Sequence, residues 1–229
     1  MIKHLACIMD GNRRWARRKG ILPWYGHREG ADVVRTVIEA CLNHGIEHLS
    51  LYAFSIENFK RSEQENGYLF KLIIEEASAV LSECVTQSIR VRFIGERSLF
   101  PSGVAETCER LERETAHCTK MHVNFLFCYG AQQELVSAVR RIVADVEDGQ
   151  ICSSELSEEL IERHLWTAGI PAPDLIIRTG GVRRLSNFLL YQAAYSELYF
   201  LDCLWPDLTR KHLDDAVAYF NSCKRNFGT

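Results

Sequence analysis

The chain has 229 residues, of which 47% are hydrophobic and 25% are charged, which is the composition of a globular protein rather than a disordered or fibrous one. This length suits one domain with a sizeable core, and we assign residues 1–229 to it. The formal net charge of −3 argues against a general nucleic-acid binder.

The start of the chain and its cysteines indicate the compartment. Asp10 and Arg13 come early and leave no apolar core for a secretory signal. No run approaches the ~20 apolar residues that a membrane-spanning helix needs. Nine cysteines occur without a CxxC pair or zinc-site spacing, which favours a reducing environment. We expect a cytoplasmic protein, with any membrane contact peripheral, at the inner membrane face.

Short apolar runs alternate with longer amphipathic segments, a rhythm typical of parallel strands joined by crossover helices. We expect strands at His4–Met9, His48–Phe54, Arg90–Ile94, His122–Phe127, Asp174–Arg178 and Leu198–Leu201. We expect helices at Glu29–Asn43, Gln64–Gln87, Ser102–His117, Gln133–Asp148, Ser157–Trp166 and Leu208–Lys224. The predicted fold is α/β, with a central, mainly parallel six-stranded sheet flanked by helices. Ligands of such sheets bind beyond the carboxyl ends of the strands.

The first strand ends in MDGNRRW, residues 9–15. Gly11 allows close approach of the backbone, free N–H groups near Asn12 can cradle phosphate oxygens, and Asp10 can hold a hard cation. Arg13 and Arg14 add positive charge. An Asp-Gly turn with a capping Asn and a solvated basic helix face explains the same residues, so both interpretations stay open.

The segment GHREG places His27 at the head of the next helix. A histidine there can donate a hydrogen bond to a phosphate without being charged. An isolated histidine in such a loop is also a common helix-capping residue.

The second strand ends in FSIENFKR, a dense group of polar side chains. The Ser55 hydroxyl and the Asn58 amide can position a leaving group, and Arg61 can screen its growing negative charge. Ser62 and Glu65 fit a capping box, so we expect Glu65 to serve that structural role at least in part.

The fifth strand ends in DLIIRTGGVRRLSNF. Arg178, Arg183 and Arg184 stand beside a glycine pair and Ser186, a set suited to a diphosphate. Two anion sites on one sheet edge suggest two phosphorylated substrates. Neither a Walker A sequence nor a GxGxxG turn occurs, so nucleotides are not the obvious choice.

These motifs, together with LSLYAFSIENFKRS, SNFLLYQAAYSELYFLDCLWPD and a terminal RNFG, resemble the cis-prenyltransferases, in particular undecaprenyl diphosphate synthases, from about Lys3 to Gly228. The resemblance implies sequential cis condensation of isopentenyl diphosphate onto an allylic diphosphate such as farnesyl diphosphate. The implied product is a long polyprenyl diphosphate, such as the undecaprenyl precursor of the lipid carrier for cell-wall synthesis. It also implies Mg²⁺ as cofactor, a homodimer and an apolar product tunnel walled partly by Gln64–Gln87.

The resemblance further implies roles for individual residues. Asp10 is expected to handle Mg²⁺ and diphosphate, with Glu197 as a second carboxylate assisting the metal. The expected catalytic residues are Asp10, His27, Ser55, Asn58 and Arg61. The expected substrate-binding residues are Gly11, Asn12, Arg13, Arg14, Trp15, His27, Phe59, Arg61, Arg178, Arg184 and Ser186.

One departure concerns the segment ILPWYGH, which has Pro23 where many bacterial relatives carry an arginine. Arg13, Arg17 or Arg18 are candidates to replace that cation. The alternatives are a shorter-chain cis-prenyltransferase and, from another class, a non-catalytic subunit of a heteromeric prenyltransferase. A phosphate-ester hydrolase or an RNA-binding module lacks the nucleophile arrangement or the aromatic signature that each requires.

Overall fold

In the computed structural model the chain is described over residues 1–224, apart from the side chains of residues 78 and 79; the terminal RNFG lies outside this part. Six strands form one sheet in the order β3-β4-β2-β1-β5-β6, and every neighbouring pair is parallel. The strands are β1 (His4–Ile8), β2 (His48–Ser55), β3 (Ile89–Ile94), β4 (Met121–Tyr129), β5 (Leu175–Arg178) and β6 (Glu197–Phe200). The predicted six-stranded parallel sheet is confirmed.

The main helices are α1 (Asn12–Arg18), α2 (Tyr25–His44), α3 (Glu63–Thr86), α4 (Ser102–Glu114), α5 (Ala131–Glu147), α6 (Glu158–His164) and α7 (Arg210–Ser222). The short helix α1 was not among the predicted helix ranges, because a basic segment of seven residues shows no apolar periodicity, although a helix start was expected at Arg13 and Arg14. Helix α2 begins at Tyr25 rather than Glu29, so His27 lies within its first turn. No helix in the described part is long and apolar enough to cross a membrane.

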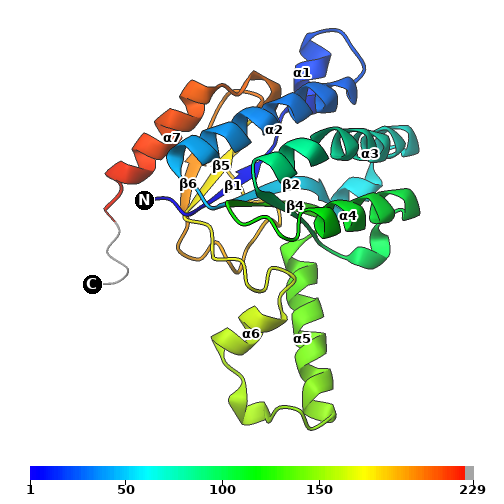
Figure 1. Ribbon diagram of the computed structural model, residues 1–229, viewed down its shortest axis with the longest axis vertical. Coiled ribbons are helices and arrows are strands. Elements are labelled where there is room, and N and C mark those ends of the chain that lie inside the picture. The colour runs from blue at the N-terminus through cyan, green and yellow to red at the C-terminus, as the bar shows by residue number, and fades with distance from the viewer. Residues whose placement is uncertain (225–229) are drawn as a thin grey trace.

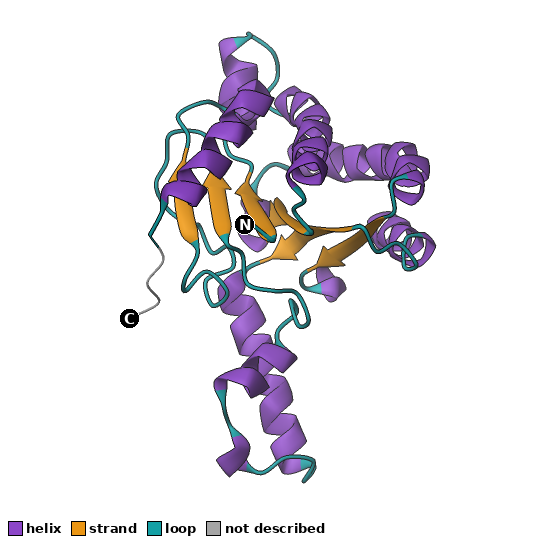
Figure 2. Ribbon diagram, turned by 60° about the vertical axis from the view of Figure 1, so that its left-hand side comes forward, coloured by secondary structure: helices purple, strands orange, loops and turns teal. Residues whose placement is uncertain are grey.

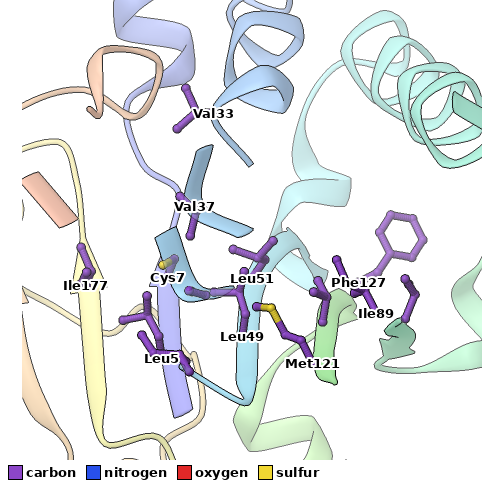
Figure 3. Close-up of a cluster of buried hydrophobic side chains, with 14 of the residues drawn as sticks. Leu5, Cys7, Val33, Val37, Leu49, Leu51, Ile89, Met121, Phe127 and Ile177 are labelled. Carbon is purple, nitrogen blue, oxygen red and sulfur yellow. The ribbon is translucent and has the colours of Figure 1, made fainter. Parts of the chain in front are cut away.

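Helices α2, α3, α4 and α7 cover one face of the sheet, as Figures 1 and 2 show. Alternate strand residues such as Leu5, Leu49 and Val123 are buried there against Val37 of α2 and its neighbours (Figure 3). Each such side chain contributes about 1.5–3 kcal/mol through its burial. Most of the apolar core therefore lies on this face.

The opposite face carries a smaller apolar cluster that includes Ala6, Leu126, Ile176 and Phe188. Helices α5 and α6 do not cover this face but extend away from the sheet as an arm (Figures 1 and 2). They pack mainly against each other.

The strand order places β2, β1 and β5 side by side. Because these strands are parallel, their carboxyl ends meet at one edge of the sheet. The three polar segments that follow them, beginning near Met9, Ser55 and Thr179, are thus brought together by topology.

Candidate active site

The carboxylate of Asp10 is held between two guanidinium groups just beyond β1. Its Oδ2 accepts a 2.8 Å hydrogen bond from Arg178, and its Oδ1 accepts a 3.2 Å hydrogen bond from Arg14. Gly11 follows with a φ of 114°, which favours glycine and allows the turn into α1. Asp10 is thereby fixed in position while 30% of its side chain stays exposed.

Arg178 connects Asp10 to the loop after β5. The arginine is only 4% exposed, and a buried guanidinium requires such partners. It donates a 2.8 Å hydrogen bond to Ser186 Oγ and another to the carbonyl of Arg184. The Arg184 side chain itself is exposed. Of the predicted isopentenyl diphosphate residues, Arg178 and Ser186 therefore meet directly.

Glu65 forms the centre of a second charged cluster. Its Oε1 lies 3.3 Å from Arg61 Nη1, 3.6 Å from Arg13 Nε and 3.7 Å from His27 Nε2. Ser62 caps α3 by accepting a hydrogen bond from the Glu65 backbone N–H, as predicted. The Glu65 carboxylate, however, faces these cations, so its main contacts are tertiary rather than those of a capping box.

Burial and the neighbouring charges of this cluster determine the protonation state of His27. Burial lowers the pKa of His27, and the charges of Arg61 and Arg13 act in the same direction, against the attraction of Glu65. His27 is therefore neutral at pH 7 and keeps one N–H to donate. The His27 imidazole, together with Arg61 and Arg13, lowers the pKa of Glu65 despite its burial, so this carboxylate is charged.

A 3₁₀ turn, Ile56–Lys60, presents Ser55 and Asn58 beside these clusters. The backbone N–H of Ser55 donates a 3.1 Å hydrogen bond to Asn58 Oδ1, which fixes the Asn58 side chain against the start of this turn. Both residues line the larger cavity described below. Phe59 packs instead against Phe54, with ring centroids 5.0 Å apart, and is not among the lining residues.

A polar cavity of about 320 Å³ lies between the two clusters. Buried Asn12 Oδ1, Arg13 Nε and His27 Nε2 have no hydrogen-bond partner within the described part of the chain. A ligand rich in oxygen atoms would satisfy the two nitrogen groups. The cavity is lined by Met9, Asp10, Gly11, Asn12, Arg13, Arg14, Arg17, His27 and Arg61.

A larger cavity of about 400 Å³ shares this polar mouth and continues between the sheet and helices α2 and α3. Asp10, Arg178 and Ser186 lie at its polar end. Apolar side chains of α2, α3 and strands β2, β3 and β4 line the rest, including Val34, Phe54, Leu69, Val91, Val123 and Phe127. The arrangement joins a polar cavity lined by cationic side chains to an apolar channel.

Four predicted residues line neither cavity: Trp15, Phe59, Arg184 and Glu197. Trp15 donates a 2.8 Å hydrogen bond from its indole N–H to Asp207. Glu197 begins β6 and is in register with Leu175, which pairs with Leu5 near the start of β1. Glu197 therefore lies at the opposite edge of the sheet from Asp10. The prediction that both carboxylates assist one metal is wrong within a single chain.

Asn187 is a residue that the sequence interpretation missed. Its amide nitrogen donates hydrogen bonds to Glu57 Oε1 (2.9 Å) and to Gln133 Oε1 (3.0 Å). Its amide oxygen accepts from the backbone N–H of Gln132, and its φ of 63° suits asparagine. Asn187 thus connects the loop that carries Ser186 to the 3₁₀ turn after β2 and to helix α5. Only its adjacency to Ser186 hinted at this role.

Comparison with known proteins gives consistent results across the chain. The family model described as "Putative undecaprenyl diphosphate synthase" matches residues 8–228. An isoprenyl transferase from Halalkalibacterium halodurans is 42% identical over 226 residues, 99% of this chain and 88% of that protein. The tritrans,polycis-undecaprenyl-diphosphate synthase (geranylgeranyl-diphosphate specific) of Pyrococcus furiosus is 41% identical over 228 residues, 99% of this chain and 86% of that protein.

Solved structures show the same fold. Lavandulyl diphosphate synthase from Lavandula x intermedia, solved with dimethylallyl diphosphate, has a TM-score of 0.97 at 34% identity, covering 100% of this chain and 98% of that chain. A probable undecaprenyl diphosphate synthase from Campylobacter jejuni has a TM-score of 0.83 at 33% identity, covering 100% and 99%. With its parallel sheet and its cationic cavity opening into an apolar channel, the chain belongs to the undecaprenyl diphosphate synthase family of isoprenyl transferases.

Proposed function

We propose that the protein condenses isopentenyl diphosphate with an allylic diphosphate, repeatedly and with cis geometry, starting from farnesyl diphosphate. One observation carries this proposal: two cationic groups meet at Asp10, where a polar cavity opens into an apolar one. The polar cavity suits the diphosphate of the allylic substrate, and Arg178 with Ser186 suits that of isopentenyl diphosphate. The apolar channel suits the hydrocarbon chain.

The reaction needs a stabilised leaving group and a dry reaction centre. The allylic C–O bond breaks and releases diphosphate, the double bond of isopentenyl diphosphate forms the new C–C bond, and a proton is lost from C2 to give a new double bond. Arg13, Arg14, Arg61 and neutral His27 stabilise the departing anion. Ser55 and Asn58 orient the substrates, and the apolar wall keeps water from the allylic cation.

Asp10 fits the proposed Mg²⁺ cofactor. Mg²⁺ is commonly bound through one or two carboxylates together with substrate phosphates, and Asp10 is the carboxylate lining the polar cavity. Bound there, Mg²⁺ would supply charge neutralisation for the diphosphate. The described residues contain no cluster of three carboxylate, cysteine or histidine side chains for a metal, which favours delivery of the metal with the substrate.

Arg17 is the proposed replacement for the arginine that relatives carry at the position of Pro23. It lines the polar cavity, whereas Arg18 does not. Arg13 also lines the cavity, but its guanidinium lies close to Glu65. Arg17 has no ion-pair partner among the described residues and so keeps its charge available for phosphate.

The product proposed first is undecaprenyl diphosphate, and a shorter polyprenyl diphosphate is the alternative. The strand register places Ile89 level with residue 3 of the chain, about seven strand positions from Asp10 toward the amino edge of the sheet. The channel therefore runs roughly 23 Å along the sheet. An extended isoprene unit of four carbon–carbon bonds spans about 5 Å, so about five units fill a straight path. A product of more than about five units has to bend within the channel or extend out of it. The rings of Phe54 and Phe127, with centroids 5.5 Å apart, are part of this channel wall.

We also propose a cytoplasmic homodimer. Val136, Val139 and Val143 are each about half exposed (51%, 53% and 48%) and recur at helical spacing along α5. Such a stripe on a projecting arm is a natural surface for a second copy of the chain.

The direct test of the reaction uses the purified chain, Mg²⁺, labelled isopentenyl diphosphate and a panel of allylic diphosphates of increasing length. We expect label in polyprenyl products whose added double bonds are cis by NMR, with mass spectrometry giving the length. Absence of extension with every primer contradicts the proposed function, and products of a few units favour the shorter-chain alternative.

A further inference from the structure

The loop between α1 and α2 forms a tip at one end of the molecule, which we define as residues 17–28. Figure 1 shows this loop at the end of the long axis opposite the α5–α6 arm. Its large apolar side chains are unusually exposed: Ile21 is 42%, Leu22 is 50% and Tyr25 is 45% exposed. The Tyr25 ring meets Tyr68 of α3 edge-on, with centroids 5.6 Å apart, which extends the surface toward α3.

The same tip is strongly cationic in a chain whose net charge is negative. Residues 17–28 contain four arginines and lysines and no aspartate or glutamate, and Arg13 and Arg14 lie just before them. Arg13 and Arg14 are engaged with Glu65 and Asp10. Arg17, Arg18, Lys19 and Arg28 form no ion pair within the part of the chain that the structure describes. Their charge is available to an external anion.

Exposed aliphatic side chains beside unpaired cations suit one kind of partner. We propose that the tip docks the protein on an anionic lipid bilayer, with Ile21 and Leu22 entering the headgroup–acyl boundary. The basic residues would contact the headgroups, because a cluster of four or more lysines and arginines is attracted to anionic lipid surfaces. Their charge and the exposed apolar area thus act together.

Other occupants fit the tip less well. Single-stranded nucleic acids are bound by stacking on aromatic rings. The tip exposes Tyr25, but that ring already meets Tyr68, and the aliphatic Ile21 and Leu22 offer no stacking surface. A second copy of the chain meeting the same patch across a two-fold axis would oppose like charges. A bilayer satisfies both the charge and the aliphatic surface.

Docking through this tip also bears on release of the product. This part of the proposal rests on the proposed function, whereas the docking itself does not. Arg17 belongs to the tip and also lines the polar cavity with Asp10 and His27. A docked tip therefore brings the cavity mouth close to the headgroups. A long hydrocarbon product could then pass into the bilayer with little exposure of its chain to water.

The test measures cosedimentation of the purified chain with vesicles, without substrates, so its outcome does not depend on catalysis. Vesicles of phosphatidylcholine alone are compared with vesicles in which one third of the lipid is phosphatidylglycerol. We expect binding to the second kind only, weakened by high salt. A double variant, Ile21→Ser with Leu22→Ser, and another, Arg18→Ser with Lys19→Ser, should each need at least about tenfold more lipid for half-maximal binding.

Matched controls alter similar side chains elsewhere. Leu99 is 40% exposed and Lys120 is also exposed, so Leu99→Ser and Lys120→Ser should bind vesicles as the wild type does. Circular dichroism melting confirms that each variant is folded. The proposal is overturned if the wild type ignores the anionic vesicles, if it binds neutral ones equally, or if the Ile21/Leu22 variant binds undiminished.

Discussion

Asn187 illustrates how one amide organises the candidate site at the scale of single residues. It donates to Glu57 on the turn after β2 and to Gln133 of α5, while its own loop carries Ser186. Ser186 in turn accepts a hydrogen bond from Arg178. We therefore propose that Asn187 is a positioning residue for the isopentenyl diphosphate site, acting through the loop that carries Ser186.

Replacing Asn187 by aspartate tests this role. Asn187→Asp keeps the shape and the tolerance for positive φ, but it places a carboxylate against Glu57 Oε1 and displaces the loop. We expect the KM for isopentenyl diphosphate to rise about tenfold, with the KM for the allylic substrate unchanged. Adding Glu57→Gln supplies a donor and should restore most of the loss. Equal effects on both KM values, or no rescue, would contradict this role.

Residues differ in how far the sequence alone could place them. The proximity of Asp10 and Arg178 could be predicted, because both residues follow the carboxyl ends of strands in a parallel sheet. The resemblance places Glu65 near the same centre, but its local pattern fits a helix cap, and only tertiary packing brings Arg13 and His27 to its carboxylate. Asn187 is joined to Glu57 across 130 positions, and no local pattern reports such a contact. Glu197 was assigned to the metal by resemblance, whereas the strand register of a single chain places it at the opposite edge of the sheet from Asp10.

At the scale of elements, the sheet carries a row of histidines at its amino edge. His4, His48 and His122 are in register across β1, β2 and β4, and the last two rings stack at 4.7 Å. His4 Nδ1 contacts the carbonyl of Pro171 and its Nε2 contacts Ser50 Oγ. In a neutral ring the Nδ1–H donates to the carbonyl, and Nε2 accepts from the hydroxyl.

This row makes stability depend on pH. Burial lowers the pKa of His4 to about 4, and burial with the neighbouring His122 lowers that of His48 to about 4. Below the unfolded value near 6.5 the unfolded chain binds more protons, so stability is complete above about pH 6.5 and falls toward pH 4. His4 should contribute a loss of about 3 kcal/mol, measured by urea unfolding. His4→Gln should make this decline shallower; an unchanged slope would contradict the assignment.

The apolar channel between α3 and the sheet makes a prediction about the product. Val91 of β3 is 2% exposed and lines the channel far from Asp10. Val91→Phe should fill that end and shorten the product by one or more isoprene units, at about 1–3 kcal/mol of stability. Mass spectrometry of the products reports the length, with Val85→Phe on the exposed side of α3 as control. An unchanged length distribution would show that the chain does not extend to Val91.

At the scale of the whole molecule, the α5–α6 arm extends away from the sheet, and the valine stripe on α5 predicts the assembly. Val139→Asp introduces a charge into the proposed dimer contact and should convert the dimer to a monomer in sedimentation velocity. Val85→Asp, which changes an exposed valine of α3, should leave the dimer intact. A monomeric wild type, or a Val139→Asp protein that stays dimeric, would contradict the assignment.

Asp10 is central to the proposed reaction, because the Arg14 and Arg178 guanidinium groups and both cavities meet at its carboxylate. The most direct test of this proposal is the rate at which label from isopentenyl diphosphate enters an allylic primer with Mg²⁺, for the wild type, Asp10→Asn and the exposed control Asp148→Asn. We predict that Asp10→Asn lowers turnover at least about a hundredfold, roughly 3 kcal/mol, while the control is unchanged. Near-normal turnover by Asp10→Asn, or no incorporation by the wild type, would contradict the account.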